Sequence, residues 1–138
     1  MIELITDRTE EDVLLKNAKG IYGYKDLNRV ESAVDTINEY LVILGSAVQM
    51  ATKTDWKPHD GFSNSDDPVE SQMIRYLKNI TKIRDVFKIS IELPGSMNNL
   101  TFEDANRIEA VLRSAISKAE ATVQSYFYSG EIYAGEGI

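Results

Sequence analysis

Residues 26–48 read DLNRVESAVDTINEYLVILGSAV, and this stretch decides the fold. Its apolar residues are separated alternately by three and four positions, which is the spacing that keeps side chains on one face of a helix. The stripe consists of Leu27, Val30, Val34, Ile37, Leu41, Leu44 and Val48. We therefore predict a helix over roughly residues 26–50. Its polar face, opposite the core, is expected to carry Asn28, Arg29, Glu31, Ser32 and Asp35.

The second half of this helix is apolar on every side, from Tyr40 through Leu44. A helix of that kind has to be covered all round. The candidates are the IELI segment at residues 2–5, the C-terminal FYSGEIYAG stretch, or another subunit, and the small residues 45–47 would let any of them approach closely. We favour the chain's own termini, because exposed apolar patches on a monomer are usually limited in size.

Two further helices follow the same apolar spacing. One is expected over residues 68–88, with Asp67 as its N-cap and Pro68 in its first turn. The other is expected over residues 102–128, because Thr101 and Asp104 match the capping-box pattern. The segment TKTDWKPHDGFSNSDD between the first two helices is expected to be a loop.

The N-terminal region carries a second capping-box match. Thr9 and Asp12 predict a short helix, which Gly20 is expected to end. The fold class is thus all-α: an antiparallel bundle of three long helices with a short N-terminal helix and irregular or short extended terminal segments. The chain should form one domain over residues 1–138, with an arm at 1–25, a helical core at 26–128 and a C-terminal clasp at 129–138.

Composition excludes several classes of function. The 138 residues suit one domain, 43% of them are hydrophobic, and the chain lacks cysteine, which rules out disulfides and thiolate sites. The net charge of −7 and a pI near 4.7 oppose binding to nucleic acid or to anionic membranes. The acidic N-terminal residues do not resemble a secretory signal, and no apolar run is long enough to span a bilayer. Synthesis in the cytoplasm is expected.

Catalytic, cofactor and metal sites are not expected. His59, the only histidine, lies near Asp60, Asp66 and Asp67, but the spacing fits neither calcium loops nor zinc sites. We interpret this stretch as a solvated loop with capping aspartates. Ser96 and Ser129 lie beside glycines without the arrangement of nucleophile, base and orienting group that covalent catalysis needs.

Aromatic residues outside the helical stripes are the candidate partner contacts. Trp56 could serve as an exposed binding residue or as a buried side chain that covers the open end of the bundle, and we favour the buried role because a long loop has to be fixed. The GIYGY turn and the YFYSGEIYAGEG stretch supply the remaining aromatic groups. The full set is Tyr22, Tyr24, Trp56, Tyr126, Tyr128 and Tyr133.

Four stretches taken together resemble a known family. They are YGYKDLNRVESAV (22–34), KTDW (53–56), LPGSMNNLTFEDANRIEAVL (93–112) and FYSGEIYAGEG (127–137). With ITDRTEEDV at the start, this ordered set resembles the small structural proteins encoded among the tail genes of phages and prophages of Gram-positive bacteria. The link between ITDRTEEDV and YGYKDLNRVE is short in this chain, whereas relatives often carry a longer, tryptophan-containing insert there.

The resemblance implies a virion-associated, non-enzymatic component of a tail or baseplate that acts through contacts with other phage structural proteins or with copies of itself. It supplies no catalytic residues. Two alternatives remain open. One is a module that binds a host-surface glycan through loop aromatic residues, by stacking and a few polar groups. The other is a cytoplasmic helper that acts in tail assembly and is absent from the finished particle.

Overall fold

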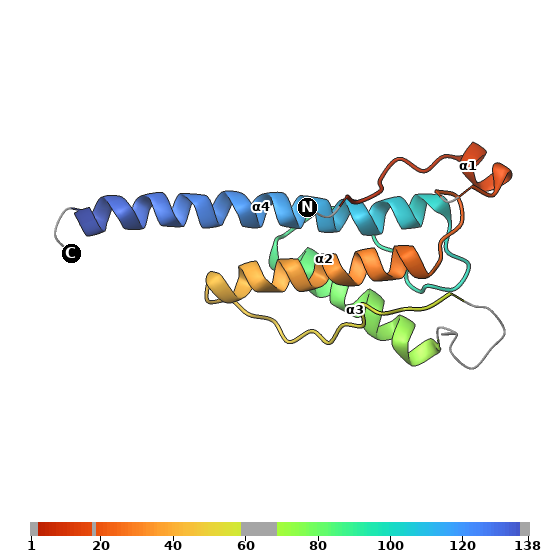
Figure 1. Ribbon diagram of the computed structural model, residues 1–138, viewed down its shortest axis with the longest axis horizontal. Coiled ribbons are helices and arrows are strands. Elements are labelled where there is room, and N and C mark those ends of the chain that lie inside the picture. Colours follow the sequence, from red (N-terminus) through yellow and green to blue (C-terminus); the bar gives the residue numbers. More distant parts are fainter. Residues whose placement is uncertain (1–2, 18, 59–68, 136–138) are drawn as a thin grey trace.

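The computed structural model describes residues 3–17, 19–58 and 69–135, with the backbone alone from residue 126 onward. Within these ranges the chain forms four helices and no strand, as Figure 1 shows. They are α1 (Glu10–Leu15), α2 (Tyr24–Ile43), α3 (Glu70–Val86) and α4 (Phe102–Gly135). The predicted all-helical bundle of three long helices and one short helix is confirmed.

The relative direction of the long helices differs from the prediction. All three begin at the same end of the bundle, and α3 crosses the other two obliquely (Figure 1). The contacts agree: Arg29 near the start of α2 pairs with Glu109, and Tyr40 near its end donates a hydrogen bond to Glu120 at 3.3 Å. The prediction of antiparallel neighbours is therefore wrong.

Two long connections make the parallel arrangement possible. Residues 44–58 return along α2, since Thr52 donates a hydrogen bond to Asp35 and the amide of Trp56 donates one to Asn28. Fifteen extended residues reach up to about 50 Å, whereas the 20 residues of α2 span about 30 Å. Residues 87–101 return in the same way before α4 begins (Figure 1). An antiparallel bundle is expected only when such connections are short.

The core lies where the three long helices meet. Val30, Ile37 and Leu41 of α2 pack with Ile80 and Ile83 of α3 and with several residues of α4, among them Ile108, Val111, Leu112 and Ala115. Five of the seven stripe residues predicted for this helix are buried. The other two, Leu44 and Val48, lie beyond the last residue of α2 and are only partly covered. The apolar spacing therefore identified the buried face correctly.

Helix α2 ends earlier than predicted, at Ile43 instead of residue 50. Gly45 has a φ of 74°, in the left-handed region that favours glycine. The amide of Gly45 donates to the carbonyl of Val42 at 3.1 Å, and the amide of Ser46 donates to that of Leu41 at 2.8 Å. This pair of bonds is a Schellman motif, which satisfies the last carbonyls and ends the helix. The glycine caps α2 and does not provide a site of close approach.

The prediction that residues 129–138 fold back as a C-terminal clasp is also wrong for the part that the structure describes. Instead of folding back, residues 129–135 continue α4, which extends past the end of α2 (Figure 1). No proline interrupts this stretch, and each internal glycine disfavours a helix by only about 1 kcal/mol. Val42 and Ile43 at the end of α2 remain 59% and 53% exposed. Among the described residues, Leu4 of the N-terminal arm lies near this part of α2, since it lines a pocket with Tyr40.

The helix starts were predicted with mixed success. The capping box of α1 is present, since Asp12 and Thr9 exchange hydrogen bonds, and so is the one at α4, where Thr101 accepts from the amide of Asp104 at 3.0 Å. Helix α3 begins two residues later than predicted, after Val69, so the expected cap at Asp67 is wrong; Asp67 itself lies outside the described residues.

Gly20 does not end α1. The helix stops at Leu15, and Lys16 takes the left-handed conformation with a φ of 52°. Gly20 has a different role, because a β-carbon added there would lie 2.1 Å from the carbonyl oxygen of Asp12. The turn after α1 therefore packs directly against the helix backbone, at a distance that admits only glycine.

Candidate functional site

Trp56 is buried and fixes the connection between α2 and α3. Its side chain is 3% exposed, and its Nε1 donates to Glu31 at 2.5 Å. The backbone of Trp56 exchanges two hydrogen bonds with the side chain of Asn28, at 2.6 and 2.9 Å. The predicted burial of Trp56 is confirmed, and the alternative of an exposed Trp56 is wrong, because only 3% of the residue is accessible.

Glu31 is the carboxylate that joins three parts of the chain. Besides Trp56, it accepts from the amide of Lys53 at 3.1 Å and from Arg75 of α3 at 2.5 Å. Its side chain is 2% exposed, so the assignment of Glu31 to a polar outer face is wrong. The helical spacing already indicated that Glu31 is buried, because it lies four positions after Leu27 and three before Val34, on the same face as the apolar stripe.

A second buried ionic cluster holds the N-terminal arm against α2 and α4. Arg8 contacts Asp26 at 3.1 Å and Glu109 at 2.5 Å. Arg29 binds both oxygens of Glu109, at 2.6 and 2.8 Å, and also pairs with Asp26. Two guanidinium groups thus neutralise two carboxylates, which is the condition for burying charge without a large loss of stability. Each carboxylate is occupied, so the cluster offers no free base for proton transfer.

Tyr22 belongs to the interior as much as to the surface. Its hydroxyl is hydrogen-bonded to the hydroxyl of Tyr76 on α3, and Arg8 lies 5.6 Å from the centre of its ring. Loss of hydration raises the pKa of the Tyr22 phenol and that of the Tyr76 phenol. Both groups are therefore neutral at physiological pH, and the pair acts as a contact between the residue 20–23 turn and α3.

One shallow pocket collects the predicted aromatic residues of the N-terminal half. It has a volume of about 650 Å³ and is lined by Tyr22, Tyr24 and Trp56 together with Met73, Met97 and Leu100, among others. The structure thus brings Tyr22, Tyr24 and Trp56 together, with Tyr24 in the first turn of α2.

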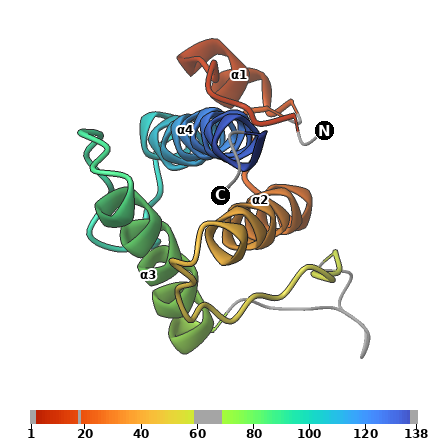
Figure 2. The same cartoon turned by 90° about the vertical axis from the view of Figure 1, so that its left-hand side faces the viewer.

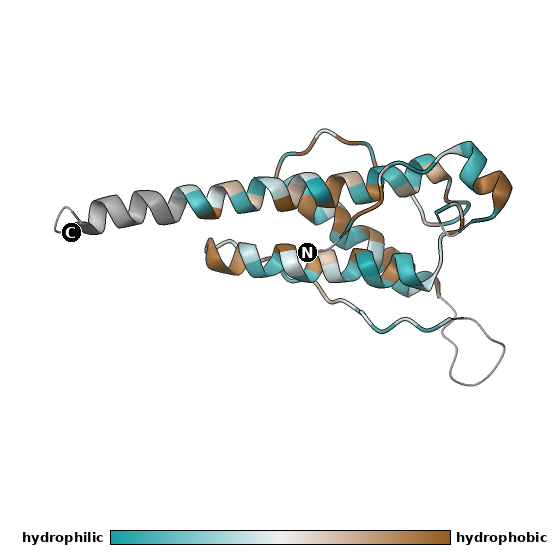
Figure 3. Ribbon diagram, turned by 45° about the horizontal axis from the view of Figure 1, so that its top comes forward, coloured by the Kyte–Doolittle hydropathy of each residue, from teal (hydrophilic) through white to brown (hydrophobic). Residues whose placement is uncertain are grey.

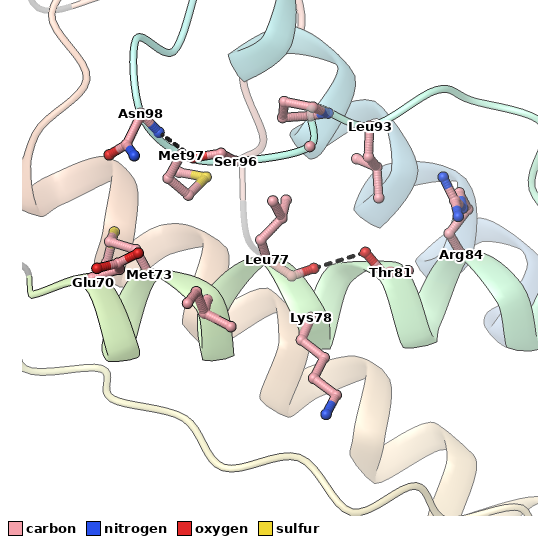
Figure 4. A pocket seen from close by; sticks show the side chains of 13 residues that line it. Glu70, Met73, Leu77, Lys78, Thr81, Arg84, Leu93, Ser96, Met97 and Asn98 are labelled. Atoms are coloured by element: carbon pink, nitrogen blue, oxygen red, sulfur yellow. Dashed lines mark hydrogen bonds between the residues drawn. The ribbon is translucent and has the colours of Figure 1, made fainter.

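This pocket continues into a longer groove beside α3. The groove has a volume of about 790 Å³ and runs between α3 and residues 93–98. Met73, Met97 and Asn98 line both spaces. Figure 4 shows Leu77 of α3 pointing toward Met97 and Leu93 on the opposite segment. We call the two spaces together the α3 groove. Methionine and aromatic linings of this kind are typical of protein-binding surfaces.

The C-terminal tyrosines do not belong to this region. Tyr126, Tyr128 and Tyr133 fall in the part of α4 for which only the backbone is described, and that backbone lies at the opposite end of the molecule from the start of α2 (Figure 1). The structure therefore separates the six predicted contact residues into two groups.

Sequence reasoning missed one exposed apolar surface, on and after α1. None of the residues of α1 is buried, and the exposed fractions are 41% for Val13, 74% for Leu14, 66% for Leu15 and 53% for Ile21. Figure 3 shows this surface as a hydrophobic tip, separate from a second one at the end of α2. The run Val13-Leu14-Leu15 in a helix too short to bury all its sides was the available signal.

His59, Asp60 and Asp66 lie outside the described residues. Within the described part of the chain, no three His, Cys, Asp or Glu side chains are grouped as metal ligands would be. None of the described helices combines the length and the apolar character needed to cross a membrane. No protein-family model matches the chain, and neither a curated protein nor a solved structure does.

Proposed function

We propose that the protein is a non-enzymatic structural component of a phage tail or tail-like particle, acting through protein–protein contacts. One observation carries the contact-based part of the proposal: the buried charges are bound to one another, while apolar side chains are exposed. Glu31 and Glu109 hold the chain together, whereas Leu14, Leu15 and Ile74 point their apolar groups to solvent. The neighbouring leucines on α1 form one exposed apolar surface and Ile74 on α3 belongs to another, and exposed apolar surfaces mark sites of protein contact.

The phage context comes from the resemblance of the ordered motifs to tail-region proteins. Two of those motifs coincide with structural features of the bundle: DLNRVE contains Asp26, Arg29 and Glu31, and NRIEAVL contains Glu109. These positions form the ionic contacts that fix the arm and the crossing connection. The motifs therefore specify a scaffold, and contacts with other tail proteins or with further copies of this chain would be made by its exposed surfaces.

A phage in which the gene is deleted tests this function. Electron microscopy of the resulting particles should show incomplete or missing tails, restored when the protein is supplied from a plasmid. Complete and infectious tails without the protein would contradict the proposal. Mass spectrometry of purified particles separates a resident component, which is retained, from an assembly helper, which is lost.

Glycan binding is a second candidate, favoured by the pocket at Tyr24. Aromatic stacking beside polar groups such as Asn98 suits a sugar, and the pocket volume of about 650 Å³ lies within the usual range for small ligands. The burial of Trp56 and the bond between Tyr22 and Tyr76 weaken this candidate, because they occupy two of the three aromatic groups. Binding of the purified protein to a glycan array would support it over a purely structural role.

A further inference from the structure

Helix α1 exposes a short acidic and apolar surface. Glu10, Glu11 and Asp12 form its first turn, and Leu14 and Leu15 follow at 74% and 66% exposed. The arm that carries α1 is held firmly, because Arg8 is 4% exposed and pairs with Asp26 and Glu109. The exposed leucines are therefore presented on a fixed support, which lowers the cost of ordering them in a contact.

The α3 groove combines an apolar lining with more basic than acidic side chains. Its lining includes Met73, Leu77 and Met97, with Ile74 59% exposed at its edge. Helix α3 carries four basic residues against two acidic ones, although the chain as a whole has a net charge of −7. Three charged residues line the groove: Glu70 near the start of α3, and Lys78 and Arg84 further along the helix (Figure 4). Arg84 also pairs with Asp85 at 3.3 Å, and Lys78 extends from α3 away from the 93–98 segment.

The two surfaces are complementary in polarity and in charge. Leucine side chains suit a groove lined by methionine and leucine, because methionine adapts to the shape of an apolar partner. The acidic first turn of α1 would lie toward the part of α3 that carries Lys78 and Arg84, away from Glu70. Matched charge of this kind orients two surfaces and selects the partner.

A chain cannot place its own α1 in its own groove. Helix α1 lies on the side of α4 away from α3, as both Figure 1 and Figure 2 show. We propose that α1 of one copy occupies the α3 groove of a second copy. The contact joins two different surfaces, so it is heterologous, and repeating it generates closed rings or filaments. This inference deepens the proposed function, on which it rests for the expectation of a repeated assembly, by naming the partner and the surface.

Three single variants test the contact, and each changes an exposed side chain. Leu14→Glu alters α1, Ile74→Glu alters the groove, and Ile43→Glu is the matched control at the far end of α2. Sedimentation velocity of each protein, from about 10 μM to about 1 mM, covers weak association. The parent and Ile43→Glu should form larger species as concentration rises, whereas Leu14→Glu and Ile74→Glu should remain single chains. Circular dichroism should be the same for all four.

An equimolar mixture of Leu14→Glu and Ile74→Glu gives the sharpest result. One variant keeps an intact groove and the other keeps an intact α1, so the mixture should form a species of two chains and nothing larger. A mixture that stays monomeric overturns the inference. A parent protein that is monomeric throughout also overturns it, as does a loss of association in Ile43→Glu alone. If the parent is monomeric in solution yet present in purified tails, the inference fails while the proposed function stands.

Discussion

Glu109 is the residue on which most of the buried charge converges. Its side chain is fully buried, and it receives hydrogen bonds from Arg8, Arg29 and the amide of Ile5. A buried carboxylate with this many charge-assisted partners links the arm, α2 and α4 in one contact. Without the Glu109 carboxylate, the guanidinium groups of Arg8 and Arg29 would share the single carboxylate of Asp26.

Replacing Glu109 with glutamine should therefore destabilise the protein strongly. Breaking a buried pair by removing one charge typically costs about 3–5 kcal/mol, because the remaining charge is uncompensated. Glu103→Gln is the matched control on the same helix, since the side chain of Glu103 is 61% exposed and its pair with Arg107 is worth little. Urea unfolding of both variants measures the difference. Equal free energies of unfolding would mean that the cluster is not structurally important.

The tyrosine pair predicts how stability depends on alkaline pH. The pKa of both Tyr22 and Tyr76 is raised by burial, so the folded protein keeps these protons where unfolded phenols ionise, near pH 10. The folded state then binds more protons than the unfolded state, and stability falls as the pH rises above about 10. The double variant Tyr22→Phe with Tyr76→Phe should lose less stability between about pH 9 and 11 than the parent. Identical slopes for the two proteins would refute this reasoning.

For the helices, the sequence predicted which face is buried more accurately than where each helix ends and in which direction it runs. The stripe from Leu27 to Leu41 predicted the buried face of α2, because a 3.6-residue period is a local property. The capping boxes at Thr9 and Thr101 were equally local and are present. The direction of the helices depends on where the connections run, and the burial of Glu31 depends on Arg75 far along the chain. Neither is contained in a local pattern.

The Schellman motif at the end of α2 can be tested with two glycines. Gly45 has a positive φ, while Gly95 does not, and a β-carbon at either position would meet no atom within 4 Å. Gly45→Ala should cost about 1 kcal/mol through backbone strain, whereas Gly95→Ala should be neutral or slightly stabilising. Thermal melting of both proteins gives the comparison. A Gly45→Ala protein as stable as the parent would exclude a strained cap.

The C-terminal part of α4 should be dispensable for the bundle. Tyr40, three residues before the end of α2, contacts Glu120, and α4 continues for 15 more residues, or about 22 Å. Deleting residues 129–138 should therefore leave the melting temperature within about 2 °C of the parent value, because the backbone of residues 129–135 lies beyond the end of α2. A drop of several degrees would restore the idea of a stabilising C-terminal clasp.

As a whole, the molecule is elongated and its two ends differ (Figure 1). The three long helices all begin at one end, and α1 lies at that end. Helix α4 extends from the other end (Figure 1). The contact proposed between α1 and the α3 groove joins two different surfaces, so it would repeat from one copy to the next. The candidate site could be predicted in part: Tyr22, Tyr24 and Trp56 do meet at one pocket, but Trp56 serves the interior.

The assignment to a tail rests on motif resemblance, so the direct measurement is the amount of this protein in purified tails. Quantitative mass spectrometry of tails separated from heads gives its copy number relative to the other tail proteins. A structural component should be present in several copies, at a ratio that stays constant between preparations. A protein abundant in the infected-cell lysate but absent from purified tails would contradict a structural role in the particle.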